Sequence, residues 1–142
     1  MQQEKFKCHA FRLKPGQDLK KEIEAFAQNE TIKAGWILSC VGSLTKAHLR
    51  FANATNGVTL DGYFEIISLS GTVSINGCHL HISISDPMGK TIGGHLMGEN
   101  IIFTTAEIII GESCELLFTR ENDGTTQWKE LQVKPKDPGL NI

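Results

Sequence analysis

Residues 79–96 limit the fold of this chain more than any other segment, because their pattern predicts a β-hairpin with one register. Polar and apolar side chains alternate from residue 79 to residue 85, which is the period of a strand that buries one face. Asp86-Pro87-Met88-Gly89 then supplies the residue types of a type I turn that is closed by a left-handed glycine. This turn places Ile84 opposite Ile92, and a slip of one residue would put Leu96 on the face of the histidines and His95 among the isoleucines.

The same register brings three of the five histidines together. His79 and His81 share one strand face, and His95 lies directly across from His81 with a Cβ separation of about 5 Å. Gly93 is on this face as well and leaves room beside the three rings. Cys78 points to the opposite face, so we do not expect it to be a ligand.

Three converging imidazoles are suitable ligands for a transition metal. Neutral imidazole binds zinc, copper, nickel and iron, and three protein ligands with an open fourth position are typical of catalytic zinc. His79, His81 and His95 therefore predict a site for a divalent transition metal, with zinc as the favoured ion. The alternative stays open at this point, because a His-x-His pair on an exposed strand is often only polar surface.

The composition is that of one ordinary globular domain. With 142 residues, of which 40% are hydrophobic and 21% charged, the chain can bury a core without a disulfide or a structural metal. Cys8, Cys40, Cys78 and Cys114 show no Cys-x-x-Cys spacing and lie in apolar runs, so we expect buried, reduced thiols. Residues 1–7 lack the apolar segment of a secretion signal, and no apolar run approaches the roughly 20 residues of a membrane span. We expect a soluble, cytoplasmic protein that is not associated with a membrane.

One helix is expected, over residues 18–29, because Leu19, Ile23, Phe26 and Ala27 recur at helical spacing. Besides the histidine hairpin, strands are expected over residues 6–13, 35–44, 47–52, 63–69, 72–75, 101–110, 114–120 and 126–133. The predicted fold class is α+β, with a mainly antiparallel β-sheet and one principal helix near the N-terminus. Residues 1–142 should form a single compact domain.

Two segments carry further expectations. Residues 101–110 are apolar on both strand faces, which is typical of a central strand or of one that is buried in a subunit interface. Residues 134–142 include two prolines and a glycine, so we expect them to form a loose tail.

Several short motifs resemble one family over nearly the whole chain. They are RLKPGQDL at residues 12–19, VGSL at 41–44, GYFEIISLSGT at 62–72, HLH at 79–81, GGH at 93–95 and AEI at 106–108. In this order and spacing they resemble the plants-and-prokaryotes conserved (PPC) domain family, in its free-standing prokaryotic form without an AT-hook. The resemblance implies a compact α+β domain that assembles as a homotrimer and is associated with DNA binding. It also implies, as in some members, a metal at the positions of His79, His81 and His95.

The resemblance extends to a segment that is linked to partner binding. Plant members of the family carry a Gly-Arg-Phe-Glu-Ile-Leu segment for this role. Gly62-Tyr63-Phe64-Glu65-Ile66-Ile67 is similar to it, with Tyr63 in place of the arginine. The resemblance therefore implies that protein partners bind at residues 62–67.

Direct DNA binding is not favoured by the charges of the chain. The net charge is −2, and the three arginines are Arg12, Arg50 and Arg120. There is no Arg-Gly-Arg-Pro hook to enter a minor groove. We expect an affinity for random duplex DNA no better than roughly 10⁻⁴ to 10⁻⁶ M at physiological salt. Any role at DNA should be indirect, through partners, or should come from a surface that the trimer forms.

The residues support two classes of function. In the first, the chain is a trimeric regulatory or scaffolding module that holds a metal ion or a small anionic ligand at the histidine face. In the second, it is a metal-dependent enzyme of the hydrolase type with an unknown substrate, because a zinc-bound water has a pKa of about 7 and can attack a carbonyl or phosphate. Glu65, Glu107 and Asp86 are the carboxylate candidates for the general base of that enzyme, and Glu65 is the first to test. A cupin is disfavoured because no glutamate follows His79 and His81 at the spacing that cupins use, and no Gly-x-Ser-x-Gly motif of a serine hydrolase is present.

Overall fold

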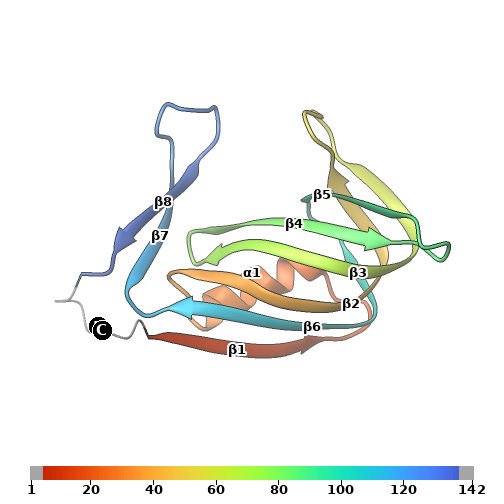
Figure 1. Ribbon diagram of the computed structural model, residues 1–142, viewed down its shortest axis with the longest axis horizontal. Helices are drawn as coiled ribbons and strands as arrows, with labels where there is room; N and C mark the ends of the chain where they lie inside the picture. Colours follow the sequence, from red (N-terminus) through yellow and green to blue (C-terminus); the bar gives the residue numbers. More distant parts are fainter. Residues whose placement is uncertain (1–4, 138–142) are drawn as a thin grey trace.

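The computed structural model describes residues 5–137, which form one helix and eight strands. In chain order the elements are β1 (Phe6–Leu13), α1 (Leu19–Asn29), β2 (Gly35–Arg50), β3 (Val58–Ser74), β4 (Gly77–Ser85), β5 (Thr91–Leu96), β6 (Ile101–Ser113), β7 (Leu116–Glu121) and β8 (Glu130–Pro135). Six strands form one antiparallel sheet in the order β1-β6-β2-β3-β4-β5, while β7 and β8 form a separate hairpin (Figure 1). The α+β class with one helix near the N-terminus is confirmed.

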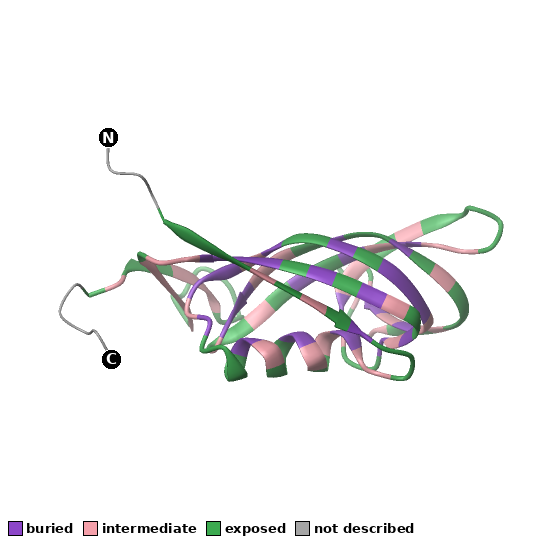
Figure 2. Ribbon diagram, turned by 90° about the horizontal axis from the view of Figure 1, so that it is seen from below, coloured by how far each residue is buried: buried purple, intermediate pink, exposed green. Residues whose placement is uncertain are grey.

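The core lies between α1 and one face of the six-stranded sheet. Figure 2 shows the helix running along one face of the sheet. The helix contributes Leu19, Ile23 and Ala27, none of which is exposed to solvent. The end of β2 also pairs with β5, so the strands from β2 to β5 curl toward one another. This single core accounts for the one compact domain over the described residues.

Helix α1 begins where the sequence predicts it, because Asp18 caps its first turn. One carboxylate oxygen of Asp18 accepts a hydrogen bond from the backbone N–H of Lys21 at 3.3 Å, as expected for an N-cap. The other oxygen accepts from the backbone N–H of Glu99 at 2.9 Å. The cap therefore also fixes the start of the helix to the connection between β5 and β6.

The β4–β5 hairpin has the predicted register, with Ile84 opposite Ile92. In the turn, Gly89 has a φ of 79°, the left-handed conformation that favours glycine. The Asp86 carboxylate accepts hydrogen bonds from the backbone N–H groups of Met88 and Lys90, both at 2.9 Å. This side chain stabilises the tight turn by satisfying donors that would otherwise be left to solvent.

Two pairs of predicted strands are in fact single long strands. β2 runs without a break through residues 44–47, where a shift of register between Leu44 and Lys46 marks a bulge instead of an end. β3 likewise continues through Gly71, which pairs with β4. A Cβ atom at Gly71 would collide with the backbone carbonyl of His79, so this glycine allows close pairing and does not end the strand.

Other expectations meet a mixed outcome. β6 is an interior strand between β1 and β2, as its two apolar faces predict. The loose tail is wrong for Lys134 and Pro135, which pair with β7 as part of β8, while residues 138–142 lie outside the described part of the chain. Within residues 5–137, no helix is both long and apolar enough to cross a bilayer.

The four cysteines are free thiols, but only Cys40 is fully buried. Cys78 and Cys114 are half-buried, and Cys8 is exposed, so the expectation of four buried thiols is wrong. The reason is topological, because β1 lies at the edge of the sheet and an apolar run on an edge strand can have a solvent-facing side. Burial raises the pKa of Cys40 to about 12, which keeps this thiol neutral.

Candidate metal centre

His79 and His81 project from the outward face of β4, and His95 projects from β5 beside them. The alternation of β4 produces this arrangement, because Leu80 and Ile82 turn into the core and leave the histidines between them in solvent. His81 lies directly opposite His95 in the hairpin, as predicted from the register. All three predicted ligands therefore meet at one place.

The three rings are close enough to share an ion. One ring nitrogen from each of the three histidines lies within 4.8 Å of the others, and the Nε2 atoms of His79 and His81 are 3.2 Å apart. A tetrahedral zinc with Zn–N bonds of about 2.1 Å requires nitrogens about 3.4 Å apart, so only small side-chain rotations are needed. The donor set fits a borderline transition metal such as zinc, and it leaves one side open to solvent.

The environment favours the neutral imidazole that a metal requires. The pKa of His95 is lowered to about 4, mainly by burial and then by the neighbouring His79 and Arg50. The pKa of His79 is also lowered, first by burial and then by His81 and Arg120, while Glu130 acts in the opposite direction. Burial and like charges both disfavour a protonated ring, so these two histidines stay neutral at a lower pH than an ordinary histidine does.

The Cys78 side chain turns toward α1, as the alternation of residues along β4 predicts. Its Sγ donates a hydrogen bond to Glu24 of α1 at 3.2 Å. Burial, followed by the charge of Glu24, raises the pKa of Cys78 to about 12, so the thiolate is disfavoured. Gly93 has a different role from the one predicted, because a Cβ there would come within 2.7 Å of the carbonyl oxygen of Ile82. The missing side chain allows close strand pairing and does not serve as space for a ligand.

A second strand end brings an arginine to the cluster. Arg50, the last residue of β2, pairs directly with His95 of β5. The connection after β5 holds this pairing in place, because the backbone N–H of Met97 donates to the carbonyl of His48 at 2.9 Å. Asn100, which is fully buried, accepts a hydrogen bond from the backbone N–H of His48 at 2.7 Å.

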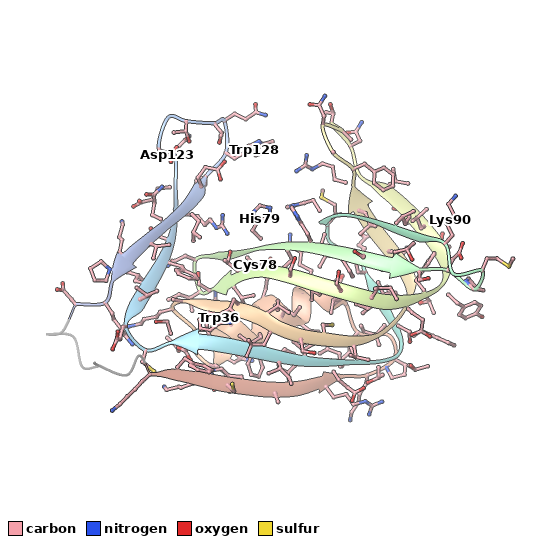
Figure 3. The ribbon with its side chains drawn as sticks, viewed as in Figure 1. Trp36, Cys78, His79, Lys90, Asp123 and Trp128 are labelled. Atoms are coloured by element: carbon pink, nitrogen blue, oxygen red, sulfur yellow. The ribbon has the colours of Figure 1, made fainter. Side chains whose placement is uncertain are left out.

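The β7–β8 hairpin forms the far side of a cleft that begins at the histidines. Figure 3 shows His79 on the side of β4 that faces this hairpin, with Trp128 near the hairpin tip. The cleft has a volume of about 560 Å³, and Arg120, Trp128 and Glu130 line it together with His79. Arg120 is held by a hydrogen bond from its guanidinium to the Thr72 hydroxyl at 2.8 Å.

The sequence reasoning missed these residues of the hairpin. Arg120, Trp128 and Glu130 are 25 to 35 residues beyond His95 in the chain, and no spacing or motif links them to the histidines. Glu130 is the carboxylate that faces the cluster, because it lines the same cleft as His79 and His95. Only the long-range docking of the hairpin could have revealed it.

Glu65 is not part of this site. It pairs with Ser85 at the far end of β4, whereas His81 pairs with Ser70, so Glu65 is about 13 Å along the strand from the histidines. Glu65 instead lines a small hollow beside Tyr63 and Phe103.

The predicted partner segment, residues 62–67, alternates between the core and the surface. Ile66 is buried, and Phe64 is partly buried against the core. Tyr63, Glu65 and Ile67 face solvent, with Tyr63 and Ile67 more than half exposed. These three side chains are the part of the segment that a partner could contact.

The motifs and the fold together lead to the family. A family model of the Plants and Prokaryotes Conserved (PCC) domain, here abbreviated PPC, matches residues 1–114. The chain belongs to the PPC family. The match contains all three histidines and ends before β7, so the hairpin that lines the far side of the cleft lies outside the matched PPC residues.

Curated relatives carry a PPC-like region within longer chains. Bifunctional protein GlmU of Synechococcus sp. (strain JA-3-3Ab) is 44% identical over 128 residues, which are 90% of this chain and 21% of the GlmU chain. AT-hook motif nuclear-localized protein 8 of Arabidopsis thaliana is 31% identical over 115 residues, 75% of this chain and 30% of the plant protein. This PPC chain therefore spans less than a third of the length of either relative.

Solved structures share the PPC fold at nearly full length. A hypothetical protein from Salmonella enterica has a TM-score of 0.91 at 39% identity, covering 94% of this chain and 97% of that one. A metal-containing protein from Archaeoglobus fulgidus has a TM-score of 0.75 at 27% identity, covering 93% and 99%. A plant- and prokaryote-conserved protein from Pyrococcus horikoshii has a TM-score of 0.72 at 27% identity, covering 93% and 98%.

Proposed function

We propose that this PPC domain is a trimeric regulatory or scaffolding module that holds one zinc ion on His79, His81 and His95. The observation that carries the proposal is the convergence of three ring nitrogens within 4.8 Å on a solvent-facing strand pair. The metal-containing protein from Archaeoglobus fulgidus, which shares the fold at 27% identity, supports it. Bound zinc would supply a Lewis acid with an open position for an oxygen ligand.

The homotrimer is supported by an apolar outer surface of the sheet. Val41, Ile67 and Ile109 lie on adjacent strands β2, β3 and β6 and are 60%, 57% and 39% exposed. Tyr63 and Phe103 extend this surface, with ring centroids 4.9 Å apart. We call these five residues the apolar face. Exposed apolar side chains gathered on one face of a sheet are typical of protein interfaces, so the apolar face is the surface on which copies of this chain would associate.

Partner proteins provide the proposed link to DNA. The net charge is −2, and two of the three arginines, Arg50 and Arg120, line the cleft beside the histidines. They are therefore not arranged along a surface that could follow phosphates. Binding of partners at residues 62–67 and a cytoplasmic location remain expectations from the sequence.

Elemental analysis of tag-free protein tests the metal site. Wild type should retain about one zinc per chain after dialysis. The zinc content of His81→Ala should be at least about tenfold lower, because two ligands hold zinc far less tightly than three. The matched control is His48→Asn, because His48 lies outside the cluster and an asparagine amide can replace its contact with the Gly98 carbonyl. Equal zinc content in wild type and His81→Ala would show that the cluster is only a polar strand face.

A metal-dependent hydrolase is the alternative function, and the position of Glu130 in the cleft beside the histidines favours it. A carboxylate in the cleft beside His79 could accept a proton from a water molecule, which is the role first assigned to Glu65. The zinc-loaded protein should then hydrolyse p-nitrophenyl acetate or p-nitrophenyl phosphate, and Glu130→Gln should slow the reaction at least about a hundredfold. Turnover no faster than with free zinc would reject the alternative without affecting the metal site.

A further inference from the structure

The cleft between the histidines and the β7–β8 hairpin carries more positive charge than the protein as a whole. Arg50, Arg120 and Lys129 line it, and Glu130 is the one carboxylate beside them among residues 5–137. The whole chain has a net charge of −2, so this concentration of cations is local. A cleft whose lining carries an excess of one sign of charge attracts ligands of the opposite sign.

Both arginines have unused hydrogen-bond donors. Arg50 donates to the carbonyl of Ala54 at 3.3 Å, and Arg120 donates to the hydroxyl of Thr72 at 2.8 Å. Within residues 5–137, neither guanidinium lies within 4 Å of a carboxylate, although each carries five N–H groups. A planar fork of donors with no acidic partner is suited to a carboxylate or a phosphate.

The tip of the hairpin adds a flat apolar wall. Trp128 is 59% exposed, and the guanidinium carbon of Arg50 is 5.9 Å from the centre of its ring. Met97 lines the same cleft. Figure 3 shows Trp128 near the tip of the hairpin. An exposed indole beside a cation provides a surface on which a planar ring can stack.

We propose that this cleft binds a small organic anion that carries a planar ring, with its carboxylate or phosphate between Arg50 and Arg120 and its ring against Trp128. The proposal rests on the proposed function at one point, because an oxygen of the same anion would occupy the open position of the zinc on the three histidines. The cleft volume of about 560 Å³ is suited to a ligand of this size. Since Arg120 and Trp128 lie beyond residue 114, the share of this recognition that the hairpin supplies lies outside the part of the chain that matches the family model.

Isothermal titration of the zinc-loaded protein tests the proposal with four probes. Adenosine 5′-monophosphate and benzoate each combine an anion with a ring, inorganic phosphate has the anion alone, and adenosine has the ring alone. At least one of the first two should bind at least about tenfold more tightly than either phosphate or adenosine, because stacking and charge act together. The nucleotide and benzoate also distinguish a phosphate ligand from a carboxylate ligand.

Variants show whether the hairpin is responsible. Arg120→Gln and Trp128→Leu should each weaken the tighter of the two ring-bearing anions at least about tenfold. Arg12→Gln is the matched control, because Arg12 lies on β1 and donates to Thr104 and Thr105, away from the cleft. Binding that is equal in wild type, Arg120→Gln and Trp128→Leu would overturn the proposal.

Zinc content separates this inference from the proposed function. If the protein holds one zinc per chain and neither ring-bearing anion binds, the inference is wrong and the metal site stands. If no zinc is held but a ring-bearing anion binds with the same dependence on Arg120 and Trp128, the metal site is wrong and the anion cleft stands.

Discussion

The histidine cluster and the apolar face are both exposed regions of one sheet, but they differ in what could cover them. The cluster on β4 and β5 consists of three polar rings beside a cationic cleft. The apolar face on β2, β3 and β6 presents Val41 and Ile67, which have no polar groups to offer a ligand. Exposure alone therefore does not identify a function, whereas the chemistry of the exposed atoms does. Polar rings in a cluster indicate a ligand site, and exposed apolar side chains on one sheet face indicate a protein interface.

The largest expected effect is the loss of assembly when a charge is placed on the apolar face. Val41→Asp would bury a carboxylate without a partner in each copy of the interface, which is strongly unfavourable. Light scattering should give three times the chain mass of 15.6 kDa for wild type and a single chain mass for Val41→Asp. Zinc content should not change. A monomeric wild type at micromolar concentration would refute the trimer, and a loss of zinc in Val41→Asp would show that the two regions are coupled.

The next effect compares the two faces of β4. Leu80→Ala removes a side chain that is 1% exposed and should lower the free energy of unfolding by about 2–5 kcal/mol. His81→Ala, one residue further along, should lower that of the metal-free protein by less than about 0.5 kcal/mol, because surface substitutions create no cavity. Urea unfolding of both variants in the presence of a chelator measures the difference. A large loss in His81→Ala would mean that the cluster also supports the fold.

The smallest effect is a pH dependence of the metal-free protein. The pKa of His95 is about 4 in the folded chain, mainly because of burial, whereas an unfolded histidine has a pKa of about 6.5. Between these values the unfolded state binds more protons than the folded state, so the free energy of unfolding should fall as the pH drops from about 6.5 toward 4. Urea unfolding at about pH 7 and about pH 5 gives the slope.

Replacing the ring isolates this contribution. His95→Gln should reduce the decrease in stability between the two pH values, because the side chain no longer titrates. The size of the change is limited, since His95 is partly exposed and solvent weakens its interactions. An identical pH dependence in wild type and His95→Gln would show that the ring titrates as freely in the folded chain as in the unfolded one.

Local signals in the sequence were sufficient for the hairpin that carries the ligands. The alternation of residues 79–85 and the turn at Asp86 determine the register, and the register places His81 opposite His95. The start of α1 at Leu19 follows in the same way from the spacing of apolar residues and the cap at Asp18. These features depend on residues within one turn or one strand pair, so they can be derived without the rest of the fold.

The surroundings of the ligands depend on contacts that no local pattern encodes. Arg50 reaches His95 because the end of β2 pairs with β5, and Arg120 reaches the cleft because β7 docks near Thr72 of β3. Glu65 lies away from the histidines because the pairing of β3 with β4 places Ser70, and not Glu65, opposite His81. Sequence alone thus determined which side chains could bind a metal, since that follows from local strand geometry. The tertiary structure decided which charges and rings surround them, because strands far apart in the chain come together only through the common core.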